Sequence, residues 1–350
     1  MTLQAHSVSD IARSLMAIDS TTGSESGVID ATEFLLEQLG WRVSRIPASI
    51  GRDCLLARSS DDPDVTLSTH LDTVPPYIPP SISGDRLSGR GACDAKGIAA
   101  SMIVAAGRLR DRQVPVALLF VVGEETTHDG ARAANQWVAA NLPIRPRVLI
   151  NGEPTESTMA LGTKGAMRLV IRTTGRAAHS AYPELGDSAI TRLVELLAEI
   201  DQLSLPTDPV LGRTTVNIGA ISGGVADNVI APAAEARLMA RLVTPADEVM
   251  PVFERWIAGR ATIEQGITVP PVRLGAVDGF PTSVAAFATD LPSLTNWGTP
   301  YLFGPGSVHV AHTDDEHVSI AELERAVDAY VRLATAAIEG GQGAEGAQGA

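Results

Sequence analysis

The sequence predicts an α/β protein: a mixed, largely parallel sheet flanked by helices, with a smaller α+β unit inserted into it. In the first half of the chain, short apolar stretches alternate with longer stretches whose apolar residues recur at helical spacing. Alternation of this kind implies parallel strands joined by helices. The chain has 350 residues, of which 45% are hydrophobic, so it is long enough for two domains and a large core.

Each element of the first half follows from its local pattern. A helix is predicted for residues 27–39, with Ser24 or Ser26 as its cap, because its apolar residues share one helical face. Apolar runs bounded by turn residues predict three strands, 65–69, 115–122 and 147–150. Ala-rich stretches between them predict two helices, 97–109 and 130–141.

The pattern changes after about Leu161. The predicted elements of this part are strands 167–172, 214–221 and 234–243 and helices 187–200 and 245–259. The chain then returns to the first unit through strand 301–303 and helix 320–338. We therefore expect a discontinuous larger domain (1–162 and 273–338), an inserted domain (163–272) and a disordered, low-complexity tail (339–350).

Composition excludes several classes of protein. The chain carries 41 acidic and 27 basic side chains, a net charge of −14, which argues against binding to nucleic acid or an anionic membrane. The best apolar run, 114–122, is under half of the ~20 residues that a membrane span needs. Two cysteines make no disulfide framework, and no signal pattern begins the chain, so we expect a cytoplasmic protein.

Metal-ligating residue types follow three of the predicted strands. His70 and Asp72 follow the first (STHLDTVPP), Glu124 and Glu125 the second (VVGEET), and Glu153 the third (INGEPT). The carboxyl ends of parallel strands meet at one edge of a sheet, where ligands bind in open α/β folds.

Two further segments add residues of the same kind. Asp94 lies in a Gly-rich loop before a helix (GRGACDAKG), and His312 lies near the far end of the chain (GPGSVHVAHTDDEH). Each residue alone is more often a solvated loop residue, and Glu124 with Glu125 also suits a helix cap. Five such placements together favour a metal centre. The carboxylates and imidazoles suit two borderline metal ions, with Zn²⁺ the first choice and Co²⁺ or Mn²⁺ as alternatives.

Spacing separates the roles within this cluster. His70 and Asp72 are two residues apart, so in an extended backbone they project to the same side, and one can orient the other. Glu124 and Glu125 are adjacent and project in different directions. One can therefore bind a metal ion while the other faces a water molecule as general base.

Seven motifs together resemble the M20 metallopeptidase family, which includes acetylornithine deacetylase, succinyl-diaminopimelate desuccinylase and carboxypeptidase G2. In order they are THLDTVP, GRGACDAKG, GEET, NGEPT, GRAAHSAYP, GGVADNVI and FGPGSVHVAHTDDEHV. The resemblance covers the chain from about Ile11 to Thr335. It is strongest to the acetylornithine and acetylcitrulline deacetylases, through GPGSVHVAHTDDEHV and NGEPT...TKG.

The resemblance implies a role for each residue of the cluster and a zinc aminopeptidase-like catalytic domain. Asp94 would bridge two metal ions, with His70 and Glu153 completing the shell of one and Glu125 and His312 that of the other. Glu124 would be the general base and Asp72 would lie behind His70. The family also has a cis peptide bond after its bridging aspartate, here Asp94–Ala95.

The inserted domain would be the lid and dimerisation domain of the family. His179 (GRAAHSAYP) matches a histidine that reaches the partner's active site in a homodimer and polarises the scissile carbonyl. Arg241, Lys164 and Asn228 match positions that hold substrate carboxylate or carbonyl groups. His309 and His317 match no role and are predicted to be loop residues or neighbours of the ligands, and His128 is predicted to be exposed. The segment 281–291 departs from the family pattern.

The predicted reaction is hydrolysis of an N-acyl amino acid, above all N-acetylornithine or N-acetylcitrulline. Alternatives with the same chemistry are a succinyl-diaminopimelate desuccinylase, a carrier-linked lysine or ornithine hydrolase, and an M20 dipeptidase or carboxypeptidase. The charge of −14 disfavours an acidic carrier protein. A catalytically dead metal-binding relative is the remaining alternative, and the complete set of ligands and base argues against it.

Overall fold

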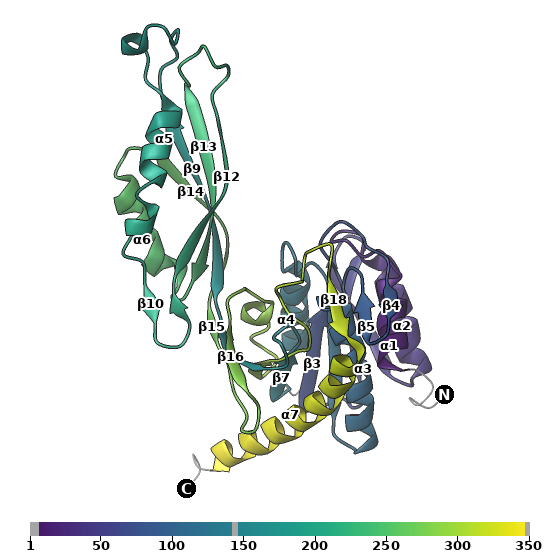
Figure 1. The fold of residues 1–350 in the computed structure, drawn as a ribbon. Helices are drawn as coiled ribbons and strands as arrows, with labels where there is room; N and C mark the ends of the chain where they lie inside the picture. Colours follow the sequence, from purple (N-terminus) through teal and green to yellow (C-terminus); the bar gives the residue numbers. More distant parts are fainter. Residues whose placement is uncertain (1–6, 142–145, 347–350) are drawn as a thin grey trace. The chain divides into compact units, whose positions relative to one another are not determined.

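The computed structural model describes residues 7–141 and 146–346 (Figure 1). It divides into two compact units. The first comprises the described residues up to Leu161, Leu274–Ser283 and those from Thr289 onward, and the second comprises Gly162–Arg273 and Val284–Ala288.

The first unit is built on a six-stranded sheet of order β1-β2-β6-β3-β7-β17. Its strands are β1 (Arg42–Ser49), β2 (Arg52–Arg58), β3 (Val65–His70), β6 (Val116–Val121), β7 (Val148–Asn151) and β17 (Thr299–Leu302). The pairs β6–β3, β3–β7 and β7–β17 are parallel, while β1–β2 and β2–β6 are antiparallel. Every residue of β3, β6 and β7 is buried, so the central strands are covered on both faces.

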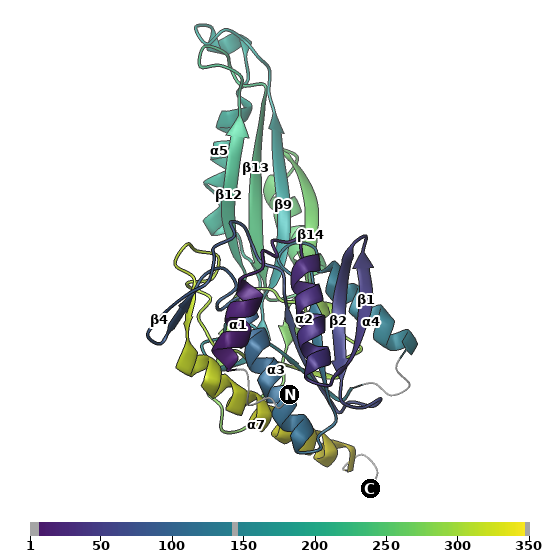
Figure 2. The same ribbon diagram turned by 90° about the vertical axis from the view of Figure 1, so that its right-hand side faces the viewer.

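Five α-helices belong to this unit: α1 (Val8–Met16), α2 (Ser26–Gln38), α3 (Lys96–Asp111), α4 (Asp129–Asn141) and α7 (Ile320–Gly346). The Ala-rich helix α3 packs against β3 and β6 and also contacts α1 and α7 (Figure 2). Small side chains allow this close approach, since most of α3 is buried. The N-cap of α2 is Glu25 rather than Ser24 or Ser26, and its side chain makes no capping bond because it binds Arg52 instead.

The remaining elements of the first unit are short. The strands β4 (Ser81–Ser83), β5 (Arg86–Ser88) and β18 (His317–Ser319) form one small sheet. The strands β8 (Met159–Thr163), β15 (Val272–Arg273) and β16 (Thr282–Ala285) form another three-stranded sheet, of which β15 belongs to the second unit and β8 and β16 are divided between the units. The 3-10 helix η4 (Leu291–Ser293) follows.

The second unit is an antiparallel sheet of order β12-β13-β9-β14 with two α-helices. Its elements are β9 (Gly165–Thr174), β12 (Thr215–Gly223), β13 (Ala233–Leu242), β14 (Thr262–Val269), α5 (Ala189–Leu197) and α6 (Ala246–Ile257), with the short β10 (Thr207–Asp208), β11 (Gly212–Arg213), η2 (Pro183–Leu185) and η3 (Ile200–Gln202). Burial alternates along β9 and β13, so one sheet face packs with α5 and α6 into a core containing Phe253 and Trp256 (Figure 1).

The predicted fold class is confirmed, and each predicted helix and strand has a counterpart within a few residues. The predictions missed α1, the β1–β2 hairpin, β14 and the shorter strands β4, β5, β8, β10, β11, β15, β16 and β18. The stretch 339–350 was expected to be disordered, but α7 continues to Gly346, and residues 347–350 lie outside the described part. Four of the eight residues 339–346 are glycine, so helix propensity does not account for this extension of α7.

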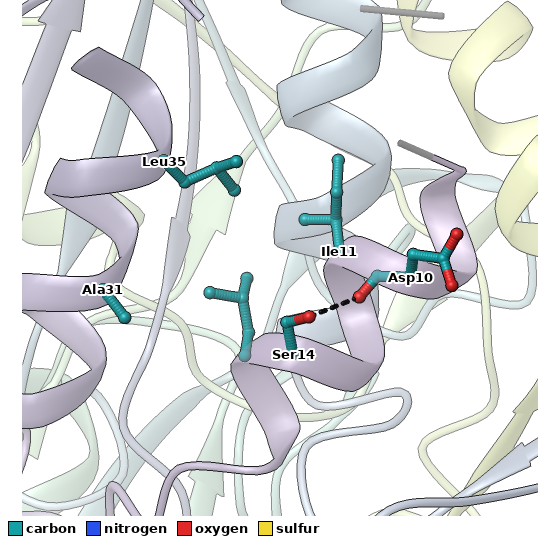
Figure 3. Close-up of a pocket in the computed structure, with 6 residues that line it drawn as sticks. Asp10, Ile11, Ser14, Ala31 and Leu35 are labelled. Atoms are coloured by element: carbon teal, nitrogen blue, oxygen red, sulfur yellow. Dashed lines mark hydrogen bonds between the residues drawn. The ribbon is translucent and has the colours of Figure 1, made fainter. Parts of the chain in front are cut away.

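Two further features of the fold concern membrane-spanning helices and a hollow outside the predicted site residues. No helix in the described part of the chain is both long and apolar enough to cross a membrane. A hollow of about 130 Å³ lies between α1 and α2, lined by Asp10, Ile11, Ser14, Leu15, Ala31 and Leu35 (Figure 3). None of these is a predicted site residue, and the lining offers few polar groups.

Candidate functional site

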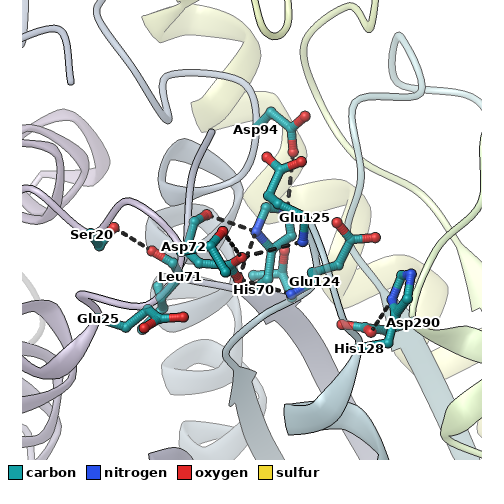
Figure 4. A network of polar contacts seen from close by, with 12 residues as sticks. Ser20, Glu25, His70, Leu71, Asp72, Asp94, Glu124, Glu125, His128 and Asp290 are labelled. Carbon is teal, nitrogen blue, oxygen red and sulfur yellow. Dashed lines mark hydrogen bonds and ion pairs between the residues drawn. The ribbon is translucent and has the colours of Figure 1, made fainter. Parts of the chain in front are cut away.

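The predicted metal-type residues of the first unit gather beyond the carboxyl ends of its parallel strands (Figure 4). His70 is the last residue of β3, Glu124 and Glu125 follow β6, and Glu153 follows β7. Gly123 makes the turn that leads to Glu124, with a positive φ of 76°. A side chain there would meet Asp129 and Arg52, so the turn requires glycine.

Three of these side chains form one candidate metal-ligand group: His70, Asp94 and Glu153. The Nε2 atom of His70 lies 3.0 Å from Oδ1 of Asp94 and 4.0 Å from Oε2 of Glu153. All three residues are buried. One cation could contact an atom of each, because their ligand atoms all lie within 4.8 Å of one another.

A second candidate group consists of Asp94, Glu125 and His312. The Nε2 atom of His312 lies 3.2 Å from Oδ2 of Asp94 and 3.1 Å from the Glu125 carboxylate. Asp94 thus turns one oxygen toward His70 and the other toward His312. This division suits a carboxylate that bridges two ions. The Asp94–Ala95 peptide bond is cis, as the family resemblance implied.

The donor set fits divalent cations. Oε1 of Glu153 is buried and has no hydrogen-bond partner among the described residues, which is costly unless a cation binds it. Burial raises the pKa of Glu153 well above its ordinary value. Hydrogen bonds to Asp94 and Glu125 raise the pKa of His312 to about 10. Protons therefore occupy the cluster without metal, and binding of cations would displace them.

His70 and Asp94 show the same mutual stabilisation. Burial opposes the charged form of His70, but the Asp72 and Asp94 carboxylates outweigh it and raise its pKa well above the ordinary value. Burial would raise the pKa of Asp94, yet hydrogen bonds from His312 and His70 lower it. Asp94 is thus an anion that lies between two imidazoles, as expected of a carboxylate that binds two cations.

Asp72 organises the surrounding backbone (Figure 4). Nδ1 of His70 lies 2.9 Å from the backbone carbonyl of Asp72 and 3.6 Å from its carboxylate. The carboxylate accepts hydrogen bonds from the backbone N–H groups of Glu124 (3.1 Å) and Glu125 (3.2 Å). The Thr22 hydroxyl donates to it at 2.8 Å. Asp72 therefore orients His70 and holds the loop that carries both glutamates.

Glu124 belongs to neither ligand group. Burial, then the neighbouring Glu153 carboxylate, raise the pKa of Glu124 well above its ordinary value. A carboxylate with a raised pKa is a stronger base than an exposed one. Glu124 is therefore placed for proton transfer, while its neighbour Glu125 faces His312.

The other four predicted residues belong to the second unit and lie at opposite ends of β9 and β13. His179 and Asn228 lie in the loops beyond Thr174, where the Ser180 N–H donates to the Asn228 carbonyl at 3.0 Å. His179 is exposed. Lys164 and Arg241 lie at the other end. Lys164 Nζ donates to the Arg213 carbonyl at 2.7 Å.

The uncovered sheet face near Arg241 is cationic. Burial, then Arg168, lower the pKa of Arg241, and burial, then Arg213, lower that of Lys164. Farther along the same face, by contrast, Arg172 and Arg237 both pair with Glu235. The cationic end is therefore available to an anionic group.

The prediction that His128 is exposed was wrong. Its side chain is only 12% exposed, and its Nδ1 lies 2.8 Å from Oδ1 of the buried Asp290 (Figure 4). Asp290 also acts to raise the pKa of Glu124. The sequence carried no signal for this pair, because Asp290 lies within 281–291, where the family pattern is lost. His309 is exposed, as expected, whereas His317 is partly buried in β18.

Comparison with known proteins finds a family model and sequence relatives that match most of the chain. A family model described as Peptidase family M20/M25/M40 matches residues 66–336. A protein of Aspergillus terreus named "Probable carboxypeptidase" is 36% identical, with 93% of this chain and 85% of that protein covered.

Two solved structures share the fold. One is a tripeptidase from Staphylococcus aureus, with a TM-score of 0.78 and 20% identity over 95% of this chain and 98% of that chain. The other is a dinuclear metal-binding peptidase from Bacillus subtilis, with a TM-score of 0.69 and 16% identity over 95% of this chain and 98% of that chain.

Proposed function

Because this chain belongs to peptidase family M20/M25/M40 and is a metal-dependent hydrolase, we propose that it acts as a carboxypeptidase on small peptides. Such an enzyme cleaves the amide bond that joins the last residue, so the leaving group is an amino acid with a free carboxylate. The observation that carries the proposal is the pair of ligand groups sharing Asp94, with Glu124 beside them.

Peptides are favoured over N-acetylornithine as substrates by the sequence relatives. Similar proteins of Aspergillus terreus, Aspergillus flavus and Aspergillus oryzae are named probable carboxypeptidases. The cationic sheet end around Arg241 suits either substrate, since both present a carboxylate next to the scissile amide. N-acetylornithine and N-acetylcitrulline remain the second candidate.

The residues of the first unit supply the chemistry of amide hydrolysis. When bound, two divalent cations would polarise the scissile carbonyl and lower the pKa of an attacking water, with Zn²⁺ the first choice. His70, Asp94, Glu153, Glu125 and His312 would hold them. Glu124 takes a proton from the attacking water at its carboxylate and returns it to the departing amine. The Asp72 carboxylate keeps Glu124 in place by accepting a hydrogen bond from the backbone N–H of Glu124.

The second unit would supply substrate recognition. Arg241 and Lys164 would bind the terminal carboxylate, and Asn228 the peptide carbonyl. His179 would donate a hydrogen bond to the scissile carbonyl oxygen as negative charge develops on it. In this proposal His179 comes from the partner subunit of a homodimer. The two buried free cysteines, Cys54 and Cys93, agree with the further proposal of a cytoplasmic location.

A substrate panel tests the proposed activity. We expect kcat/KM to be highest for N-blocked dipeptides with a free carboxyl terminus, and about 10–100-fold lower for the same peptides as C-terminal amides, since a charged hydrogen bond contributes about 1.5–3 kcal/mol. The Arg241→Met variant should lose this discrimination. Arg237→Met is the matched control, because Arg237 lies on the same strand and pairs with Glu235. A higher kcat/KM for N-acetylornithine than for every peptide would instead identify a deacetylase.

The proposed homodimer is supported by the outer strand of the second unit. β12 is an edge strand whose residues are nearly all exposed, and its Ile221 is 55% exposed. On the nearby α5, Val194 is exposed as well. An exposed apolar edge strand is a ready site for pairing with a second copy.

Sedimentation equilibrium tests the dimer. The wild-type chain should sediment at twice its monomer mass, and Val194→Glu with Ile221→Lys should yield monomers that keep their metal ions. Ile50→Lys is the control, since Ile50 is fully exposed at the tip of the β1–β2 hairpin in the first unit. A wild-type monomer with full activity would exclude a role for His179 across subunits.

A further inference from the structure

The loop that carries Asp94, residues 89–95, is hydrogen-bonded to a buried glutamate from a distant part of the chain. Glu316 is 1% exposed and lies just before β18, four residues after His312. Its Oε1 atom lies 2.9 Å from the backbone nitrogen of Gly91 and 3.3 Å from those of Cys93 and Asp94. One carboxylate oxygen thus accepts from three N–H groups of the Asp94 loop.

The second oxygen of Glu316 binds a buried arginine of the same loop. Nη1 of Arg90 donates to Oε2 at 2.6 Å, and Arg90 is also 1% exposed. The Arg90 guanidinium donates further to the carbonyls of Thr313 (3.2 Å) and Pro76 (3.3 Å). A buried ion pair is tolerated when hydrogen bonds satisfy both charges, and here the carboxylate has five donors, the fifth being the Cys93 thiol at 3.8 Å.

The backbone of the loop is shaped for this contact. Gly91 has a φ of 87°, a conformation that a residue with a side chain rarely adopts, and a Cβ atom there would lie 3.0 Å from the side chain of Lys96. The Gly89 N–H also donates to the Glu316 backbone carbonyl at 3.0 Å. Successive N–H groups that converge on one anion form a concave, rigid cradle.

We propose that Glu316 is a positioning residue for the metal centre: it fixes Asp94 relative to His312. The proposal rests on the proposed two-metal site. His312 and Glu316 belong to one short segment, and Glu316 grips the backbone of Asp94 itself. The carboxylate therefore sets the separation between two ligands that lie 218 positions apart in the sequence and 3.2 Å apart in space.

This role depends on the acceptor oxygen rather than on the negative charge. Without an acceptor, the N–H groups of Gly91, Cys93 and Asp94 would be buried and unpaired, and the loop would shift to satisfy them. Such a shift moves Asp94 away from His312. Loss of an orienting partner of a metal ligand typically costs about 10–100-fold in metal affinity.

Two double variants separate the acceptor from the ion pair. Arg90→Met with Glu316→Gln removes both charges and keeps an oxygen that accepts from the loop. Arg90→Met with Glu316→Leu removes both charges and the acceptor. Replacing a buried ion pair by apolar residues of similar volume is often neutral for stability, and Nη2 of Arg90 has no partner among the described residues. Asp315→Asn is the control, because Asp315 is the exposed neighbour of Glu316.

The readouts are Zn²⁺ affinity and the Co²⁺ absorption spectrum, and neither requires turnover. Zn²⁺ is titrated in competition with a chromophoric chelator, and circular dichroism records the thermal midpoint of each variant. We expect the Gln variant and Asp315→Asn to bind both ions within about threefold of wild type. The Leu variant should fold but bind at least one ion more than about 10-fold more weakly, with an altered Co²⁺ spectrum.

Wild-type affinity and spectrum in a folded Leu variant would overturn the proposal. Equal losses in the Gln and Leu variants would overturn it too, because charge and not the acceptor would then matter. If wild type itself bound no metal ions tightly, the proposed two-metal site would fail instead, so the two failures are distinguishable.

Discussion

The Glu124→Gln variant is expected to bind two metal ions per chain, as wild type does, and to lose about 10³-fold in kcat. General acid–base catalysis by a positioned side chain contributes about 10²–10⁴-fold, and an amide cannot take up the proton of the attacking water. Glu124 belongs to neither ligand group, so its replacement leaves the donor set intact. Rates with a peptide substrate and metal content of the same sample measure both quantities.

The loop should keep its shape in this variant, because the hydrogen bonds to Asp72 come from the backbone of Glu124 and Glu125. KM should therefore change little while kcat falls. Glu37→Gln serves as the control, since Glu37 is an exposed glutamate of α2. Turnover near the wild-type rate in a fully metallated Glu124→Gln enzyme would remove Glu124 as the base.

The sequence predicted that the metal-type residues meet at one edge of the sheet, because the signals for their positions are local. The apolar runs of β3, β6 and β7 have clear ends, and His70, Glu124 and Glu153 stand at or just after those ends. Parallel topology then brings them to one edge without any knowledge of tertiary contacts. The Ala-rich helix α3 was equally visible, and Asp94 lies just before its N-cap, Ala95.

Other features depend on contacts between distant residues, which produce no periodic pattern in the sequence. The β1–β2 hairpin is half exposed and contains Pro47, so its apolar alternation is weak. The contact of His128 with Asp290 joins residues 162 positions apart. The hydrogen bond between the Asp94 N–H and the Glu316 carboxylate joins residues 222 positions apart. Burial of a polar residue against one distant partner cannot be read from its neighbours in sequence.

Asp94→Ala should abolish the binding of both metal ions, whereas His312→Ala should abolish the binding of one. Asp94 faces His70 with one oxygen and His312 with the other, so its loss removes a ligand from both groups. His312 contributes only to the group with Asp94 and Glu125, and the group of His70, Asp94 and Glu153 stays complete. Metal content after dialysis, and Zn²⁺ titration against a chromophoric chelator, give the stoichiometry.

Activity should fall by more than about 10³-fold in both variants, because each removes part of the Lewis acid that two bound ions would form. Stoichiometry then distinguishes a bridging ligand from a terminal one, which rates alone cannot do. His309→Ala is the matched control, since His309 is an exposed histidine three residues from His312. One tight ion left in Asp94→Ala would contradict the bridge and leave Asp94 as a ligand of a single ion. Two tight ions in His312→Ala would instead exclude His312 as a required ligand.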